Sequence, residues 1–419
     1  MIKSHYLQSA FKRCCLTLLF LSSLTSFNAS SSDFTVDGLY YTMLSMDDLT
    51  CEVSGWDGKG DRHVIIPAIV TYKGRDISVI QIGKGAFKMP SPSSITLPSS
   101  IRVIREEAFE ECDRLSEVNL GDGLISIGKN AFRFCNKLKE IFIPSKVKEI
   151  GQGAFYHCSS LQNLSGGAAL ESIEGYAFEE CTSLQGVINF RNIEWIGPEA
   201  FYGCKSLTDV IIPATATGVS EKAFYDINLN TLKIEDGESS ISFSRVNTNY
   251  TYRPFYTARV KQLYIGREIS VGKVDNYTTF SPLEIVRGGI LELGKNINNL
   301  NENCISELDK IGFLISHNLT PPSIPEMSNT GYMNIEVRVP AEALEAYKQA
   351  PVWKNFWNIK AIEDESGISD IERDDDDSFQ VYDTAGILVD ASCTSEKLQQ
   401  LPHGVYIVVK HDKRMKIKI

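Results

Sequence analysis

Residues 127–138 read IGKNAFRFCNKL, and the same order of Ile, Gly, Ala, Phe, Cys and Leu returns along the chain at a nearly constant interval. The phenylalanines mark this interval, with one step of 22 residues and then steps of 23, at Phe87, Phe109, Phe132, Phe155, Phe178, Phe201 and Phe224. A cysteine stands three residues after five of them, at Cys112, Cys135, Cys158, Cys181 and Cys204. Apolar residues in fixed positions of a fixed period indicate one structural unit per repeat.

Each repeat contains two segments of different periodicity. Between successive copies, apolar and other residues alternate, as in residues 140–144, and this alternation predicts a short strand that ends at Pro144. The Ala-Phe-x-x-Cys-x-x-Leu segment has helical spacing and predicts a turn of α-helix or 3-10 helix on the other side of the coil. One repeat of 23 residues cannot bury its apolar face alone, so we expect stacked coils that share a long parallel sheet.

These motifs resemble the BspA-like leucine-rich repeats of bacterial surface proteins, most closely from Ile95 to Phe224. The resemblance implies an α/β solenoid, a leucine-rich repeat array of 23-residue units. It also implies a secreted or cell-surface protein, because the family includes adhesins for host and bacterial surfaces. A shared fold is a weak guide to a particular ligand.

The array is expected to be closed at both ends. Residues 30–82 lack the repeat but contain alternating apolar segments, and they predict an N-terminal β-hairpin cap. The solenoid is expected over residues 83–339, regular to about residue 228 and degenerate after it, and residues 340–362 predict a C-terminal helical cap. The aromatic side chains available to cover the last coil are Trp353, Phe356 and Trp357.

Two further segments follow the predicted cap. Residues 363–377 hold nine acidic side chains and few apolar ones, which is typical of a solvated linker. Residues 378–419 predict a small β module, with strands at 379–382 and 401–409 and a basic C-terminal strand. This module resembles the C-terminal sorting domain of type IX secretion substrates, although it is short. The resemblance implies the secretion machinery as a partner and a Bacteroidota-type source. It leaves open whether the module is a working export signal or an appended relic.

The N-terminal residues 1–29 have the features of a signal peptide: Lys3, Lys12 and Arg13 precede a short apolar run, and Ala29 is a plausible cleavage point. The apolar run is too short to span a membrane, and no later run is long enough. Removal of this segment would take the formal net charge from −11 to −14. Such a charge argues against nucleic acid or an anionic membrane surface as a partner.

The chemistry-bearing residues do not form a recognisable catalytic, cofactor or metal motif. Eight cysteines remain after the predicted signal peptide, and no two have Cys-x-x-Cys spacing. Cysteines one coil apart could approach disulfide distance, but a regular column favours buried free thiols over disulfides or a metal site. The histidines are scattered, and residues 57–61 read as a turn more readily than as a calcium loop. We therefore expect no enzyme and no cofactor.

The outward positions of the predicted strands are the candidate ligand-binding residues. In each strand, the residue between two buried ones points away from the core. These residues are Thr96, Asn119, Phe142, Ser165, Ile188 and Ile211. Three of them are large and apolar, so either another segment of the chain covers them or they form a recognition strip for a partner.

The sequence therefore predicts a non-catalytic secreted or cell-surface protein that mediates protein binding or adhesion. Extracellular or host proteins are the first ligand class. A structural component of the envelope, or a glycan-binding accessory protein, is the alternative. The sequence predicts neither the individual ligand nor the oligomeric state.

Overall fold

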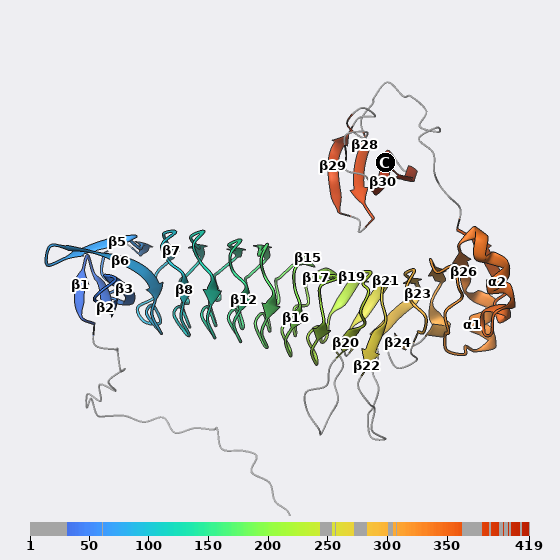
Figure 1. The fold of residues 1–419 in the computed structure, drawn as a ribbon, viewed down its shortest axis with the longest axis horizontal. Coiled ribbons are helices and arrows are strands. Elements are labelled where there is room, and N and C mark those ends of the chain that lie inside the picture. Colours follow the sequence, from blue (N-terminus) through green and yellow to red (C-terminus); the bar gives the residue numbers. More distant parts are fainter. Residues whose placement is uncertain are drawn as a thin grey trace, which may run out of the picture.

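The computed structural model describes residues 32–60, 62–243, 254–255, 257–271, 283–300, 305–306, 308–362, 379–384, 387–393, 397, 401, 404–410 and 413–418. The predicted signal peptide (1–29) and acidic linker (363–377) lie outside these residues. Short parallel strands stack along one axis into a coil that runs from the blue N-terminal strands to the orange segment in Figure 1. The predicted solenoid is confirmed.

Antiparallel strands begin the described chain. Strand β2 (Leu39–Ser45) pairs with β1 (Phe34–Val36) on one side and with β3 (Thr50–Trp56) on the other. Strands β5 (Ile69–Tyr72) and β6 (Arg75–Ile82) form a second hairpin. Because β3 pairs in parallel with β6, and β6 with the first short strand of the repeats, these hairpins are continuous with the coil.

The Ile of each Ile-Gly motif lies in a strand of the first row, which continues the sheet from β6. These strands are β8 (Val103–Ile104), β10 (Ser126–Ile127), β12 (Glu149–Ile150), β14 (Ser172–Ile173), β16 (Trp195–Ile196), β18 (Gly218–Val219), β20 (Ile241–Phe243) and β22 (Ile269–Val271). All pair in parallel, one coil apart, so the row follows the axis of the solenoid.

The alternating segments of the repeats form a second strand row. Its first strands are β4 (His63–Ile65), β7 (Ser94–Thr96), β9 (Glu117–Asn119), β11 (Glu140–Ile143) and β13 (Asn163–Gly166). A nine-stranded parallel sheet follows, with β15 (Gly186–Asn189), β17 (Leu207–Ile212), β19 (Asn228–Ile234), β21 (Arg259–Ile265), β23 (Leu283–Leu293), β24 (Ile305–Ser306), β25 (Phe313–Ser316), β26 (Glu336–Val339) and β27 (Asn358–Ala361). The strands predicted in the degenerate half therefore continue the same stacking.

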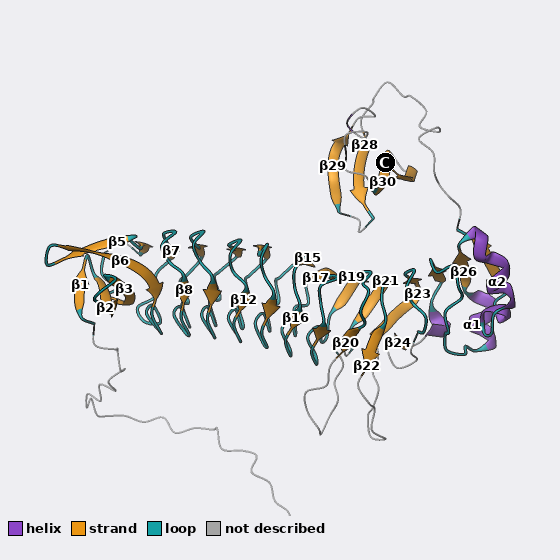
Figure 2. Cartoon of the chain, viewed as in Figure 1, coloured by secondary structure: helices purple, strands orange, loops and turns teal. Residues whose placement is uncertain are grey.

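The third side of each coil consists of tight turns, not of the helical turn that the sequence predicted. Two residues per turn have positive φ, as at Asn130 (54°) and Phe134 (61°) in one repeat, and left-handed residues interrupt a right-handed helix. Each turn keeps short-range bonds, such as the one from Cys135 N to Phe132 O at 3.2 Å, and is also bonded to the next coil, since Phe132 N donates to Ala154 O at 2.7 Å. Figure 2 shows this side as teal loops, with the purple helices near β26.

A column of phenylalanine rings fills the centre of the coil. The rings stack with centroids 4.9–5.2 Å apart and planes within 10° of parallel, from Phe87 through Phe224 to Phe255. Phe255 extends the column past the last regular repeat, into a segment where the sequence spacing had become irregular. Each ring is about 2% exposed or less, so the column is core from end to end.

The last coil is covered by helix α1 (Asn329–Asn334), by helix α2 (Leu344–Gln349) and by two of the three predicted aromatic residues. Trp353 is fully buried and its Nε1 donates to Pro322 O at 2.7 Å, and Phe356 is 5% exposed. Trp357 was expected to cover the coil as well, but it is 75% exposed, so that expectation is wrong. It lies just before β27 begins, and its backbone N–H donates to Tyr332 O at 3.0 Å while its ring stays outside the cap.

The C-terminal residues form a separate antiparallel sheet in the order β29-β28-β30-β31. The strands are β28 (Phe379–Asp383), β29 (Leu388–Cys393), β30 (Val405–Lys410) and β31 (Lys413–Lys418). The sheet has its own small core, which consists of Val381, Cys393, Tyr406 and Val408.

Candidate binding face

The outward side of the second strand row carries a line of side chains in three stretches, one per sheet, which together we call the outer column. Ile65 pairs with Thr96 and Thr96 with Asn119, and Phe142 pairs with Ser165 one sheet further on. From β15 the column continues in register through Asn189, Ile211, Lys233, Tyr264, Glu292, Ile315, Arg338 and Lys360. The column therefore runs the whole length of the array.

Four of the six predicted binding residues lie in this column and are exposed: Thr96, Asn119, Phe142 and Ser165. Phe142 has 58% of its surface exposed, which is unusual for a phenylalanine. The structure adds Ile65, which is 73% exposed and lies two coils before Asn119.

Ile188 does not face outward as predicted. It is 4% exposed and pairs with the buried Val210, and Asn189 takes the outward position beside Ile211. The register shifts between Gly186 and Val187, where Gly186 has a φ of 85°. A bulge adds one residue to a strand, and a shift of one residue exchanges the two faces.

Ile211 lies in the outer column but is only 7% exposed. It lines a cavity of about 570 Å³ together with Val187 and Lys233, and Thr384 and Ile407 of the C-terminal sheet belong to the same lining. Of the three apolar side chains in the predicted strip, Phe142 is exposed, Ile211 is covered and Ile188 points into the core.

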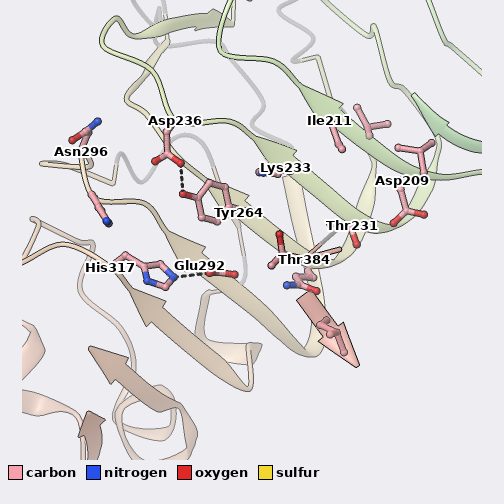
Figure 3. A pocket seen from close by; sticks show the side chains of 15 residues that line it. Asp209, Ile211, Thr231, Lys233, Asp236, Tyr264, Glu292, Asn296, His317 and Thr384 are labelled. Carbon is pink, nitrogen blue, oxygen red and sulfur yellow. Dashed lines mark hydrogen bonds and ion pairs between the residues drawn. The ribbon is translucent and has the colours of Figure 1, made fainter. Parts of the chain in front are cut away.

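Two internal hydrogen bonds organise this cavity, both drawn as dashed lines in Figure 3. The hydroxyl of Tyr264 donates to Asp236 Oδ2 at 2.7 Å, and the His317 ring lies 2.6 Å from Glu292 Oε1. Burial and the neighbouring Asp236 raise the pKa of the Tyr264 hydroxyl, so it remains a donor. Lys233 Nζ lies 5.7 Å from the centroid of the Tyr264 ring, within cation–π range.

The cavity has an extension along the solenoid. A second cavity of about 560 Å³ shares Lys295 and His317 with the first and adds Asn318, Leu319 and Glu342. The two volumes are each of the size that binds small molecules in proteins.

Sequence reasoning missed most of this cavity, although a signal was present. Lys233 and Tyr264 lie between buried pairs in the strands predicted around Leu232 and Leu263, in the same position as Phe142. Phe142 was selected because it lies between two buried residues of a strand. The same criterion would have selected Lys233 and Tyr264. Asp236 and His317 come from the loops after strands, where a periodic pattern gives no direction.

The repeat cysteines are free and buried. Each thiol donates to the carbonyl oxygen of a phenylalanine in the preceding coil, at 3.0–3.2 Å, and burial raises the pKa of the Cys135, Cys181 and Cys204 thiols. Nowhere in the described part of the chain do three His, Cys, Asp or Glu side chains converge as metal ligands. Cys304 lies outside that part.

A family model for the BspA-type leucine-rich repeat region matches the chain in six copies, over residues 80–193 and 171–253. The matched part of the chain, residues 80–253, is similar to BspA-type leucine-rich repeat regions. The match does not extend to the C-terminal sheet, and the matching model describes no catalytic family. No helix among the described residues is long and apolar enough to cross a bilayer.

Solved structures with a similar fold come from several bacteria, and no curated protein sequence matches the chain. The pneumococcal vaccine antigen PcpA is 17% identical, with 79% of this chain and 98% of that chain covered and a TM-score of 0.39. A leucine-rich repeat protein from Bacteroides ovatus is 22% identical, with 79% and 100% covered and a TM-score of 0.39. One from Bacteroides capillosus is 29% identical, with 32% and 98% covered and a TM-score of 0.29.

Proposed function

We propose that this protein is secreted or displayed at the cell surface and binds other proteins through its outer column. The observation that carries the proposal is the pair of exposed apolar residues in that column, Ile65 and Phe142, which are 73% and 58% exposed. They add nothing to the stacked core, and their apolar area would gain from burial against a protein partner. The formal net charge of −11 favours protein over nucleic acid as the ligand.

Capture of extracellular and host-surface proteins by the immobilised chain tests this proposal. The variant Ile65→Ser/Phe142→Ser should lose at least roughly tenfold in affinity, or ~1.4 kcal/mol. Ile125→Ser is the matched control, because Ile125 is 45% exposed but precedes β10 in the first strand row. Equal capture by both variants would contradict the proposal and favour a structural role in the envelope.

We also propose that residues 378–419 act as a sorting domain for the secretion machinery of a Bacteroidota-type bacterium. The resemblance of this segment to such domains supports the proposal, and so does its separate four-stranded sheet with a core of its own. Deletion of residues 363–419 should leave the protein in the periplasm, as measured by protease accessibility on whole cells. Unchanged display after the deletion would make the module a relic.

A further inference from the structure

The cavity beside Tyr264 presents hydrogen-bonding side chains on neighbouring strands. Asp209 lies on β17, Thr231 on β19, Gln262 on β21 and Glu292 on β23, and adjacent strands are about 4.8 Å apart. Carboxylates accept, and hydroxyls and amides both donate and accept. A ligand that fits this lining must offer many groups that can do both, at short and regular intervals.

Apolar side chains share the lining with the polar ones. Val187 and Ile211 lie in it beside Asp209, and the half-buried ring of Tyr264 adds further apolar surface. The matching ligand is therefore amphipathic, with a C–H face and a hydroxyl-bearing rim. Sugar rings have this character, and aromatic residues with a polar tip suit such mixed surfaces.

Four polar side chains of the lining are held in place without a ligand. Asp236 is bonded to Tyr264, and Glu292 is bonded to His317, so binding would order few of them. Side chains fixed in advance reduce the entropic cost of association. This arrangement distinguishes the cavity from the free surface around Phe142.

Charge narrows the ligand class further. The described lining contains three carboxylates, from Asp209, Asp236 and Glu292, against the two lysines Lys233 and Lys295. Among these carboxylates and lysines there is one excess negative charge, which disfavours a uronic or sialic acid. A neutral sugar can satisfy carboxylates with its hydroxyl groups.

An extended peptide fits this place less well. Peptides that add to a sheet need an unpaired strand edge. Here β17 pairs with β15 and β19, and β21 pairs with β19 and β23, so both edges of these strands are in use. A ligand in the cavity can be recognised only by side chains.

We infer that the cavity lined by Asp209, Gln262, Tyr264 and Glu292 is a binding site for a neutral oligosaccharide. This site is separate from the protein-binding positions Ile65 and Phe142, which lie several coils toward the N-terminus. The second cavity, beyond Lys295 and His317, gives room for further sugar residues. The protein would then hold a glycan and a protein ligand at different points of one face.

Titration calorimetry of the full chain with maltotriose, cellotriose and chitotriose tests this inference, with a hyaluronan tetrasaccharide as the acidic comparison. At least one neutral sugar should bind saturably and more tightly than the acidic one. Tyr264→Ala and Gln262→Ala should each weaken that binding by roughly tenfold. Asn119→Ala, in the outer column but outside the cavity, should leave it unchanged.

The opposite results would overturn the inference. They are no saturable binding of any neutral sugar, tighter binding of the hyaluronan fragment, or equal effects of the Gln262 and Asn119 variants. Tyr264→Phe guards against a folding defect, because it keeps the ring and removes only the bond to Asp236. The Ile65→Ser/Phe142→Ser variant should bind the sugar normally, so the two binding proposals can fail independently.

Discussion

The thiol of Cys135 donates a hydrogen bond to the carbonyl oxygen of Phe109, 3.2 Å away in the preceding coil. The same carbonyl accepts the backbone N–H of Cys112 at 3.2 Å. Cysteine is thus a small core residue that also satisfies a buried acceptor. The series ends at Ile227, which is buried three residues after Phe224 and has no donor in its side chain.

The five repeat thiols should be reduced and unreactive in the native protein. Burial raises the pKa of thiols in this column, and thiolate is the reactive form. An aromatic disulfide reagent should titrate them at pH 8 only after denaturation in guanidinium chloride. The titre of the denatured chain should not rise after prior reduction, and a gain of two thiols from this column would contradict the structure.

Phe155→Ala should destabilise the protein by about 3–5 kcal/mol, the usual cost of removing a buried phenylalanine. Phe155 is fully buried between Phe132 and Phe178, with ring centroids 5.2 Å from both. Phe142→Ala is the matched control and should change stability by no more than about 0.5 kcal/mol. Urea unfolding measures both, and similar losses would show that Phe142 is core.

Ile188→Ser should be strongly destabilising, by about 2–5 kcal/mol, because it truncates a buried apolar side chain and leaves a hydroxyl in its place. Asn189→Ser, one residue further along the same strand, should be nearly neutral because Asn189 faces outward. Thermal unfolding of the two variants tests the position of the bulge. If Asn189→Ser proved the costlier change, the register of β15 would be wrong.

The contribution of Glu179 to stability should fall as the pH rises from about 4.5 to 7. Burial, Glu199 and Glu180 raise the pKa of Glu179 to about 7 from its ordinary value of 4.5, so the folded state binds the proton more tightly than the unfolded state in this window. Glu179→Gln should raise the melting temperature at pH 8 and reduce the loss between pH 5 and pH 8. Lys222→Gln should have the opposite effect, because Lys222 lowers that pKa. If the stability of Glu179→Gln varied with pH as that of the unchanged protein does, the raised pKa of Glu179 would be wrong.

The sequence predicted the solenoid because its information is periodic. The Phe and Cys columns, the strand rows and the buried free cysteines follow from positions that repeat every 23 residues. Two of the errors arose where one residue changes the local geometry. At Gly186 a bulge exchanged the faces of Ile188 and Asn189, and left-handed residues such as Asn130 and Phe134 turned an apparent helical spacing into tight turns.

The cavity was hidden for a different reason. Asp236, Asn296 and His317 follow different strands, and only the stacking of coils with unequal loops brings them to one place. A repeat pattern predicts what neighbouring coils share, whereas a binding site depends on how they differ. The departures from the repeat in the second half of the array are therefore where a specific site is to be expected.

The hydrogen bond from a Phe N–H to the Ala carbonyl of the next coil has a genetic consequence. Since the donor, the acceptor, the stacked ring and the thiol recur in the units of Phe109 to Phe201, an in-frame duplication of 23 residues there would insert a coil whose two faces both match their new neighbours. Unequal recombination within the coding sequence can therefore lengthen or shorten the array without repacking its core. Such a change would alter the distance between the Phe142 region and the Tyr264 cavity by whole coils. Related proteins could then differ in this distance by a whole number of repeats.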